Sequence, residues 1–151
     1  MANGATDEGA RVSVGETALA ALFAALPVPP GGKKLRNASV PDDLPSGGLL
    51  VLRDGTRGQA VEEFLSPPRA VFRHAASLQI LVEGSDDAAR TAAIDALAGL
   101  VRAALAADRI LGGAVDWCEL QRGDGRDETE PGTRPIRVEE AQVILEYMEE
   151  M

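Results

Sequence analysis

Two residues of this 151-residue chain have side chains that often take part in covalent catalysis. They are His74, the only histidine, and Cys118, the only cysteine. A nucleophile needs a general base within hydrogen-bond reach, and that base needs an acid to orient it. Both residues fall in predicted strands, where a structural histidine and a buried, inert thiol are the ordinary cases. The sequence therefore predicts no catalytic residue.

The chain also lacks the motifs that bind phosphate groups or metal ions. Segment 31–34, with the sequence GGKK, has neither the first glycine of a P-loop nor the Ser or Thr after its lysine. One cysteine allows neither an intramolecular disulfide nor a four-ligand zinc cluster. We predict no cofactor and no metal. An acidic run without EF-hand spacing could still attract Ca²⁺ or Mg²⁺, although we interpret it as a solvated loop: Asp124, Asp127, Glu128 and Glu130.

The composition describes a folded protein of one domain. Hydrophobic residues make up 45% and charged residues 26%, which suits a globular chain rather than a disordered one. A net charge of −9 argues against nucleic-acid binding as the main function, because phosphate binding needs clustered cations. There is no signal-peptide pattern and no apolar run near ~20 residues. We expect a soluble intracellular protein without membrane contact, with a flexible tail at 1–12 and one domain at 13–151.

Two segments have the pattern of amphipathic helices that pack on a sheet. The first begins with a capping-box spacing at Ser13 and Glu16 and ends at the prolines of 27–30. The second is a long helix over 88–107, for which Ser85 is the predicted N-cap. Its core-facing stripe consists of Ile94, Leu97, Val101, Ala104 and Leu105, supported by Leu100.

The remaining apolar segments have the patterns of strands. The clearest, 70–83, alternates apolar and polar residues, and the others are predicted at 33–37, 49–52, 60–65, 114–121 and 136–147. Asp54-Gly55 is predicted as a turn and 122–134 as a long exposed loop. The apolar phase changes within the last strand, which predicts a β-bulge near Glu139-Glu140. This order indicates an α+β fold: a mostly antiparallel sheet with one short N-terminal and one long central helix.

Charge is distributed unevenly along the chain. Residues 33–74 carry a net charge of +2, whereas residues 75–151 carry −9. Such a chain suits head-to-tail contact between copies, and simple solubility is the alternative. The candidate contact residues in the first region are Arg53, Asp54, Gly55, Arg57, Arg69 and Arg73. The candidate acidic partners are Asp127, Glu128 and Glu130 of the 122–134 loop, or Glu146, Glu149 and Glu150 near the C-terminus.

Several short motifs follow one another in an order that matches one known family. They are Leu35-Arg36-Asn37, 45–55 (PSGGLLVLRDG), 65–68 (LSPP), 108–113 (DRILGG) and Asp116-Trp117. As an ordered set they resemble the tail terminator proteins, also called minor tail or tail-completion proteins, of long-tailed phages and phage-like gene transfer agents. The similarity covers about residues 13–148.

The resemblance implies a structural protein of the virion rather than an enzyme. Six copies would form a ring that caps the head-proximal end of the tail tube, ends tube polymerisation and joins head-completion or connector proteins. The major tail tube protein would be a partner, and genomic DNA would pass through the lumen without specific binding. Assembly in the host cytoplasm would place the protein at the tail–neck junction. The alternatives are another neck protein, such as a connector or stopper, and a cellular enzyme or small-ligand domain.

Overall fold

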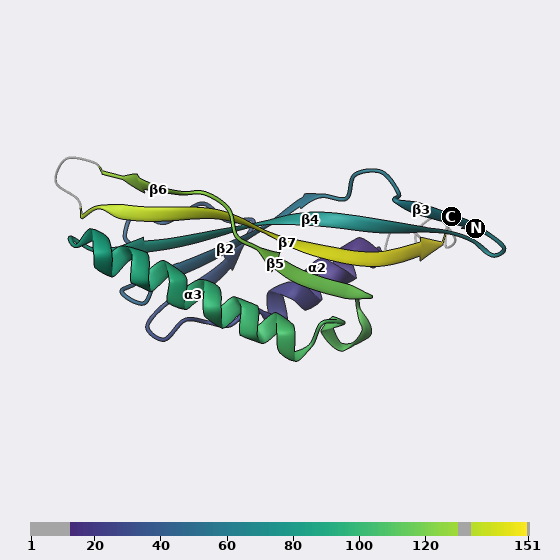
Figure 1. Cartoon of the computed structure of the whole chain (residues 1–151), viewed down its shortest axis with the longest axis horizontal. Coiled ribbons are helices and arrows are strands. Elements are labelled where there is room, and N and C mark those ends of the chain that lie inside the picture. The colour runs from purple at the N-terminus through teal and green to yellow at the C-terminus, as the bar shows by residue number, and fades with distance from the viewer. Residues whose placement is uncertain (1–12, 130–133, 151) are drawn as a thin grey trace, which may run out of the picture.

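A computed structural model describes residues 13–129 and 134–150 and shows an elongated sheet with two helices against it (Figure 1). The helices are α2 (Val14–Ala25) and α3 (Asp87–Ala107), followed by the short 3₁₀ helix η1 (Leu111–Gly113). The strands are β1 (Lys33–Arg36), β2 (Leu49–Thr56), β3 (Glu62–Leu65), β4 (Pro68–Glu83), β5 (Trp117–Gln121), β6 (Gly125–Glu128) and β7 (Ile136–Glu150). None of the described helices is long and apolar enough to cross a bilayer.

The two longest strands form the middle of the sheet. The strand order is β1-β2-β4-β7-β5, with β3 also paired to β4 and β6 also paired to β7. Only β1 and β2 run parallel; every other pair among the described strands is antiparallel. The β4–β7 register is unbroken from Arg69 opposite Glu150 to Glu83 opposite Ile136. The predicted α+β class, with a mostly antiparallel sheet, is confirmed.

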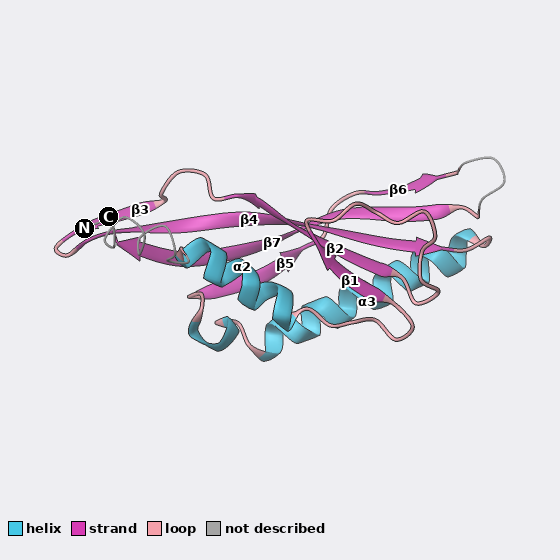
Figure 2. Cartoon of the chain, turned by 180° about the vertical axis from the view of Figure 1, so that it is seen from behind, coloured by secondary structure: helices cyan, strands magenta, loops and turns pink. Residues whose placement is uncertain are grey.

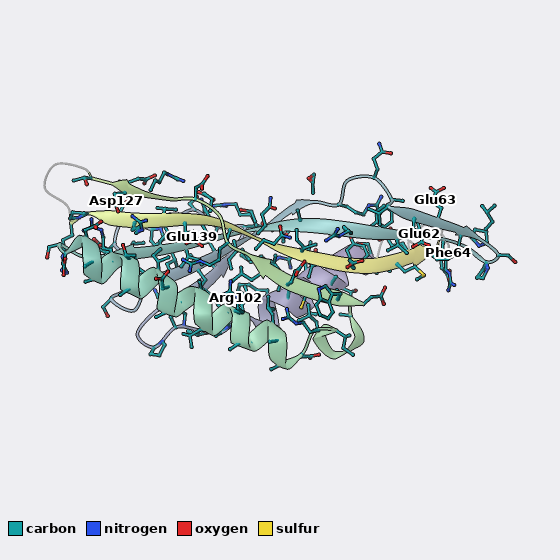
Figure 3. The ribbon with its side chains drawn as sticks, in the orientation of Figure 1. Glu62, Glu63, Phe64, Arg102, Asp127 and Glu139 are labelled. Atoms are coloured by element: carbon teal, nitrogen blue, oxygen red, sulfur yellow. The ribbon has the colours of Figure 1, made fainter. Side chains whose placement is uncertain are left out.

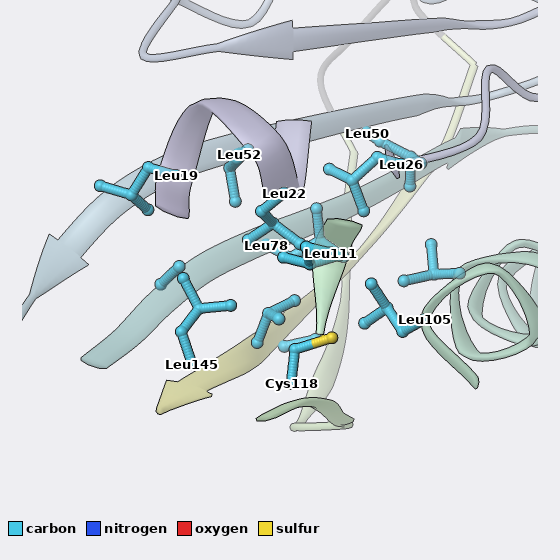
Figure 4. Packing of buried hydrophobic residues seen from close by; sticks show 14 of the residues in the cluster. Leu19, Leu22, Leu26, Leu50, Leu52, Leu78, Leu105, Leu111, Cys118 and Leu145 are labelled. Atoms are coloured by element: carbon cyan, nitrogen blue, oxygen red, sulfur yellow. The ribbon is translucent and has the colours of Figure 1, made fainter. Parts of the chain in front are cut away.

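Both helices lie on the same face of the sheet, where they bury the main core (Figures 2 and 4). The Ser13 hydroxyl accepts the Glu16 N–H at 3.0 Å, which confirms the Ser13 half of the predicted capping box, whereas the Glu16 carboxylate accepts hydrogen bonds from Arg36 instead. For α3 the predicted cap, Ser85, is wrong: the Asp86 carboxylate accepts the Ala88 N–H at 3.1 Å. Because the helix begins at Asp87, the residue immediately before it takes the capping position.

The predicted bulge at Glu139-Glu140 is also wrong. The β4–β7 register passes through both residues without a shift. The apolar phase changes because β7 is buried on opposite faces along its length. Val138 packs in a small second cluster on the face away from the helices, whereas Val143 belongs to the helix-covered core. That second cluster contains Leu49, Val51, Leu81 and Val138, with Leu35, Leu44 and Ile136 packed against it.

The segment predicted as a loop at 122–134 contains a strand, β6, which pairs with β7. All four β6 residues are exposed, so no buried face imposes an apolar alternation that a sequence could show. Strands β5 and β6 pair with the same edge of β7, and the register shifts between the Gln121–Gln142 pair and the Gly125–Glu139 pair. The connecting segment 122–124 therefore has one residue more than the stretch of β7 that lies opposite it. At Gly123 an added Cβ would lie 1.8 Å from the carbonyl oxygen of Glu140. Glycine is therefore required at this close approach of two backbones.

Candidate assembly surfaces

The residues predicted to form a turn, Asp54 and Gly55, lie instead in an irregularity inside β2. The register between β2 and β4 shifts between Arg53 and Thr56. Gly55 has a φ of +67°, and a Cβ there would lie 2.0 Å from the carbonyl oxygen of Ala75. Glycine is the residue that combines a left-handed backbone with such a close approach. The one extra residue of this bulge changes which of the following residues face each side of the sheet.

Three side chains hold Asp54 in this bulge. Asn37 accepts the Asp54 backbone N–H through Oδ1 at 3.1 Å, and Arg36 Nε donates to the Asp54 carboxylate at 3.0 Å. The imidazole of His74 contacts the Asp54 carbonyl oxygen through Nε2. Burial alone would raise the pKa of Asp54, but the hydrogen bonds from Arg36 and Asn37 lower it overall. Asp54 is therefore a structural anchor for the bulge.

His74 is buried between the bulge and the last strand. Its Nδ1 lies 2.9 Å from the hydroxyl oxygen of Tyr147. A backbone carbonyl can only accept, so Nε2 carries a hydrogen toward Asp54, and in the neutral imidazole Nδ1 accepts the Tyr147 hydroxyl hydrogen. Helix α2 closes over this pair at Gly15, where a Cβ would lie 2.9 Å from the same hydroxyl oxygen. Both ring nitrogens thus have structural partners.

The buried phenol of Tyr147 predicts a loss of stability at alkaline pH. Burial raises its pKa and Glu149 acts in the same direction, while Arg57 opposes them. In the unfolded chain the Tyr147 phenol ionises near its ordinary pKa of 10.0, and in the folded chain it ionises at a higher pH. The contribution of the neutral phenol to the free energy of unfolding is therefore complete below pH 10. This contribution is lost as pH rises through the higher folded pKa.

Tyr147 is the only tyrosine, so ultraviolet titration of phenolate absorbance reads this group directly. The native midpoint is expected above that of the urea-unfolded chain. In Tyr147→Phe the phenolate signal disappears, and the denaturation midpoint should fall less steeply above pH 10 than in the unchanged chain. Coinciding midpoints for native and unfolded chains would contradict the buried position of the phenol.

Arg57 is the predicted basic contact residue with the most internal partners. Its guanidinium forms an ion pair with Glu149 at 2.5 Å and lies 4.0 Å from the centre of the Phe72 ring. Two hollows, of about 390 and 350 Å³, flank this ion pair at the end of the helix-covered face. The pair joins the segment after the bulge to the end of β7.

The other three predicted arginines do not gather with Arg57. By strand alternation Arg53, Arg69 and Arg73 point to the face away from the helices. Arg53 Nε donates to Gln79 at 3.3 Å, and the Arg69 guanidinium lies 4.9 Å from the Phe64 ring centre. Arg73 is exposed. The structure therefore places these candidates on two faces of the sheet.

Three of the six predicted acidic partners, Asp127, Glu128 and Glu149, are already paired within the chain. Asp127 lies 3.4 Å from Arg137 and 3.5 Å from Arg90, and Glu128 lies 3.0 Å from Arg126. Glu130 lies outside the described residues. The exposed pair of Arg126 and Glu128 contributes little to stability, whereas Arg90 is a buried partner of Asp127. All of these pairs leave less charge for a partner.

A polar cluster that the sequence did not indicate lies between α3, β7 and the segment after β5. The Glu139 carboxylate, 6% exposed, accepts two hydrogen bonds from Arg122, at 2.6 and 2.9 Å (Figure 3). Arg122 also reaches Asp95 of α3 at 2.8 Å. The hydrogen bond to Glu139 raises the pKa of Arg122, and Asp95 acts in the same direction. The sequence contains one indication of this cluster: Glu139 is an acidic residue at a position that the alternation of Ala141 and Val143 assigns to the buried face of β7.

The hairpin formed by β3 and β4 carries exposed apolar side chains at one end of the sheet (Figure 3). Leu65 is 82% exposed and Val61 is 58% exposed. Glu62 and Glu63 are exposed beside them, and neither forms an ion pair with another described residue. Exposed apolar groups with polar residues around them are typical of an interaction site.

The corner between α3 and β5 carries a second exposed apolar group. Ile110 is 50% exposed and Trp117 is 41% exposed. The Arg109 guanidinium lies 4.9 Å from the centre of the Trp117 ring, and its Nη1 donates to the carbonyl of Cys118 at 2.9 Å. Val115, which falls inside the strand predicted at 114–121, lies before β5 and is buried in the core. The predicted strand is therefore shorter at its start than the sequence indicated.

Cys118 packs in the main core beneath this corner (Figure 4). Burial raises the pKa of its thiol, although Arg109 nearby acts in the opposite direction. Within 13–129 and 134–150, no group of three or more His, Cys, Asp or Glu side chains is arranged to hold a metal ion.

No model of a known protein family matches the chain, and no curated protein matches its sequence. The fold and the surfaces described above define an α+β protein with two exposed apolar surfaces at the edges of an elongated sheet.

Proposed function

We propose that the protein is a tail terminator of a long-tailed phage or of a phage-like gene transfer agent. In this role it forms a ring, expected to be hexameric, that caps the head-proximal end of the tail tube. The ring ends tube polymerisation and joins the tail to the head-completion proteins at the neck of the virion. The proposal rests on the ordered motifs of the sequence, and the structure supports it through the way in which those motifs meet.

The observation that carries the proposal is that separate motifs combine into single structural units. Arg36 and Asn37 belong to the first motif and Asp54 to the second, and the three side chains together hold the β2 bulge. In the 108–113 motif, Asp108 Oδ2 accepts the Gly112 N–H at 2.8 Å and shapes the corner next to Trp117. The LSPP motif forms the turn of the exposed hairpin. Every motif therefore serves the fold or an exposed edge.

Charge and shape agree with a ring component. Exposed contact residues at separated edges suit heterologous assembly, in which each copy presents two different surfaces to its neighbours. The chain also has an excess of acidic residues, which would let a duplex pass through a ring without being held.

The proposal is tested by native mass measurement of the purified chain, alone and mixed with the tail tube protein encoded by the same genome. We expect a hexamer that binds the end of the tube. Particles from which the gene is deleted should have tails of irregular length. A gene located among metabolic genes, or turnover that His74→Ala or Cys118→Ala abolishes, would favour a cellular enzyme. Normal tails on particles that fail to join heads would favour a connector or stopper.

The predicted basic contact makes a separate test. The double replacement Arg53→Glu and Arg57→Glu should impair ring closure or tube capping and give tails of uncontrolled length in electron micrographs. Electrostatic complementarity sets register and association rate in such contacts. Because Arg57 is paired with Glu149, the matched control is Arg57→Glu with Glu149→Lys, which restores the internal pair with its signs exchanged. Normal tail lengths in the double variant would remove these arginines from the contact.

A further inference from the structure

Strands β5 and β6 pair with the same edge of β7, but only β5 is anchored in the core. Cys118 of β5 is fully buried, and Leu120 packs against the main core. All four residues of β6, 125–128, are exposed, and this strand lies at the end of the sheet opposite to β3 (Figure 1). Burial of apolar surface is the dominant favourable term in folding, and no β6 side chain contributes to it.

The side chains of β6 reach the rest of the chain through ion pairs. Asp127 Oδ1 lies 3.4 Å from Nη1 of Arg137 in β7 and 3.5 Å from Nε of Arg90 in α3 (Figure 3). Arg126 lies 3.1 Å from the Glu140 carboxylate. Charge-assisted hydrogen bonds are ordinarily about 2.7–2.9 Å long, so the two contacts of Asp127 are loose. Because β6 carries no apolar side chain, no hydrophobic contact of its own reinforces them.

The buried charges near β6 keep other partners when this strand leaves. Arg90 Nη1 donates to the carbonyl oxygen of Gly84 at 2.7 Å, a contact that does not involve β6. Arg122, which precedes the strand, is held by Asp95 and by the buried carboxylate of Glu139. The strand can therefore separate from its first residue onward, a glycine, without removing every partner of a buried charge.

We propose that β6 opens and closes as a unit while β5 and the rest of the sheet stay paired, and that ionic strength sets how often it opens. The Debye length is about 10 Å at 0.1 M salt and about 3 Å at 1 M, so added salt screens the ion pairs and raises the open population. Opening uncovers the backbone of β7 at 136–139, and an unpaired edge can pair with another chain. The closed strand protects this edge. The opening does not depend on the proposed ring.

Amide hydrogen exchange of the full-length chain, followed residue by residue by NMR, tests the opening. The amides of β6 and β5 that face β7 are compared in one sample, each relative to its rate in an unfolded peptide. We expect the β6 amides to be protected, but at least ~100-fold less than the β5 amides. Because opening of β6 exposes little surface, low concentrations of urea should accelerate exchange in β5 and leave exchange in β6 nearly unchanged.

Salt and one substitution test what holds the strand. Raising the NaCl concentration from about 0.05 M to about 1 M should accelerate exchange in β6 about 5-fold and leave β5 unchanged. Asp127→Asn should accelerate β6 to a similar extent at low salt and reduce the effect of salt. Asp124→Asn is the matched control, since it removes the same charge three residues away and Asp124 forms no ion pair with another described residue. Circular dichroism checks that both variants keep the fold.

Each of the other outcomes overturns a stated part of the proposal. Equal protection and equal urea dependence in β5 and β6 would show that β6 opens only together with the sheet. Exchange in β6 at the rate of an unfolded peptide would show that the strand does not close. If neither salt nor Asp127→Asn changed exchange in β6, or if Asp124→Asn accelerated it equally, the ion pairs of Asp127 would not be what holds the strand.

Discussion

Replacement of Leu97 by alanine is expected to lower the free energy of unfolding by about 2–5 kcal/mol. Leu97 is 5% exposed and packs from α3 into the main core, which also contains Val143 of β7. Its Cδ1 lies close to Gly48, where an added Cβ would be only 2.7 Å away. The tight fit means that the shortened side chain leaves a cavity in addition to losing buried surface.

Urea denaturation measures this effect, and Leu100→Ala on the same helix is the matched control. Leu100 is 41% exposed, so its replacement should change the free energy of unfolding by no more than about 0.5 kcal/mol. If Leu97→Ala left the denaturation midpoint unchanged while Leu100→Ala lowered it, the opposite side of α3 would be the one that packs on the sheet.

Removal of the Arg122 guanidinium is expected to destabilise the fold by about 3–5 kcal/mol, because it leaves the carboxylate of Glu139 buried without its partner. Glu139 is 6% exposed and receives both of its guanidinium hydrogen bonds from Arg122. Arg122→Met is the direct test, since methionine keeps much of the side-chain length. Adding Glu139→Leu to it should recover most of the lost stability, because the buried charge is then gone as well.

Arg126→Met is the control for this cluster. Arg126 also forms two ion pairs, with Glu128 and Glu140, but its side chain is 50% exposed. Exposed pairs contribute little to stability, so the loss of Arg126 should cost far less than that of Arg122. Equal losses for Arg122→Met and Arg126→Met would show that the Glu139 carboxylate is reached by water.

The elements that the sequence predicts well are those with one buried face. The alternation at 70–83 becomes β4, and the spacing of Leu97 and Leu105 becomes the buried side of α3, because burial on one side imposes the period. Strand β6 fails this condition, since both of its faces are exposed. The final strand fails it in another way, since burial changes from one face to the other at Val138.

Charge and position in turns identify the candidate contact residues, but neither property reveals pairing within the chain. Arg57 follows β2 and Glu149 lies in β7, and only the pairing of both strands with β4 brings these distant residues together. The exposure of Leu65 and Ile110 is also a property of the assembled sheet edges. Neither residue interrupts a helical or strand period, so the sequence alone carried no signal for it.

The central position of β7 also determines when the protein can fold during synthesis. This strand lies between β4 and β5, yet it is made after every other strand of the sheet. Its ladder with β4 joins residues far apart in the chain, which makes formation of the native topology slow. When synthesis has just completed β5, the edge of β4 that pairs with β7 still has no partner strand. Ribosome-bound chains should therefore remain protease-sensitive until β7 has emerged, and chaperones should bind them before that point.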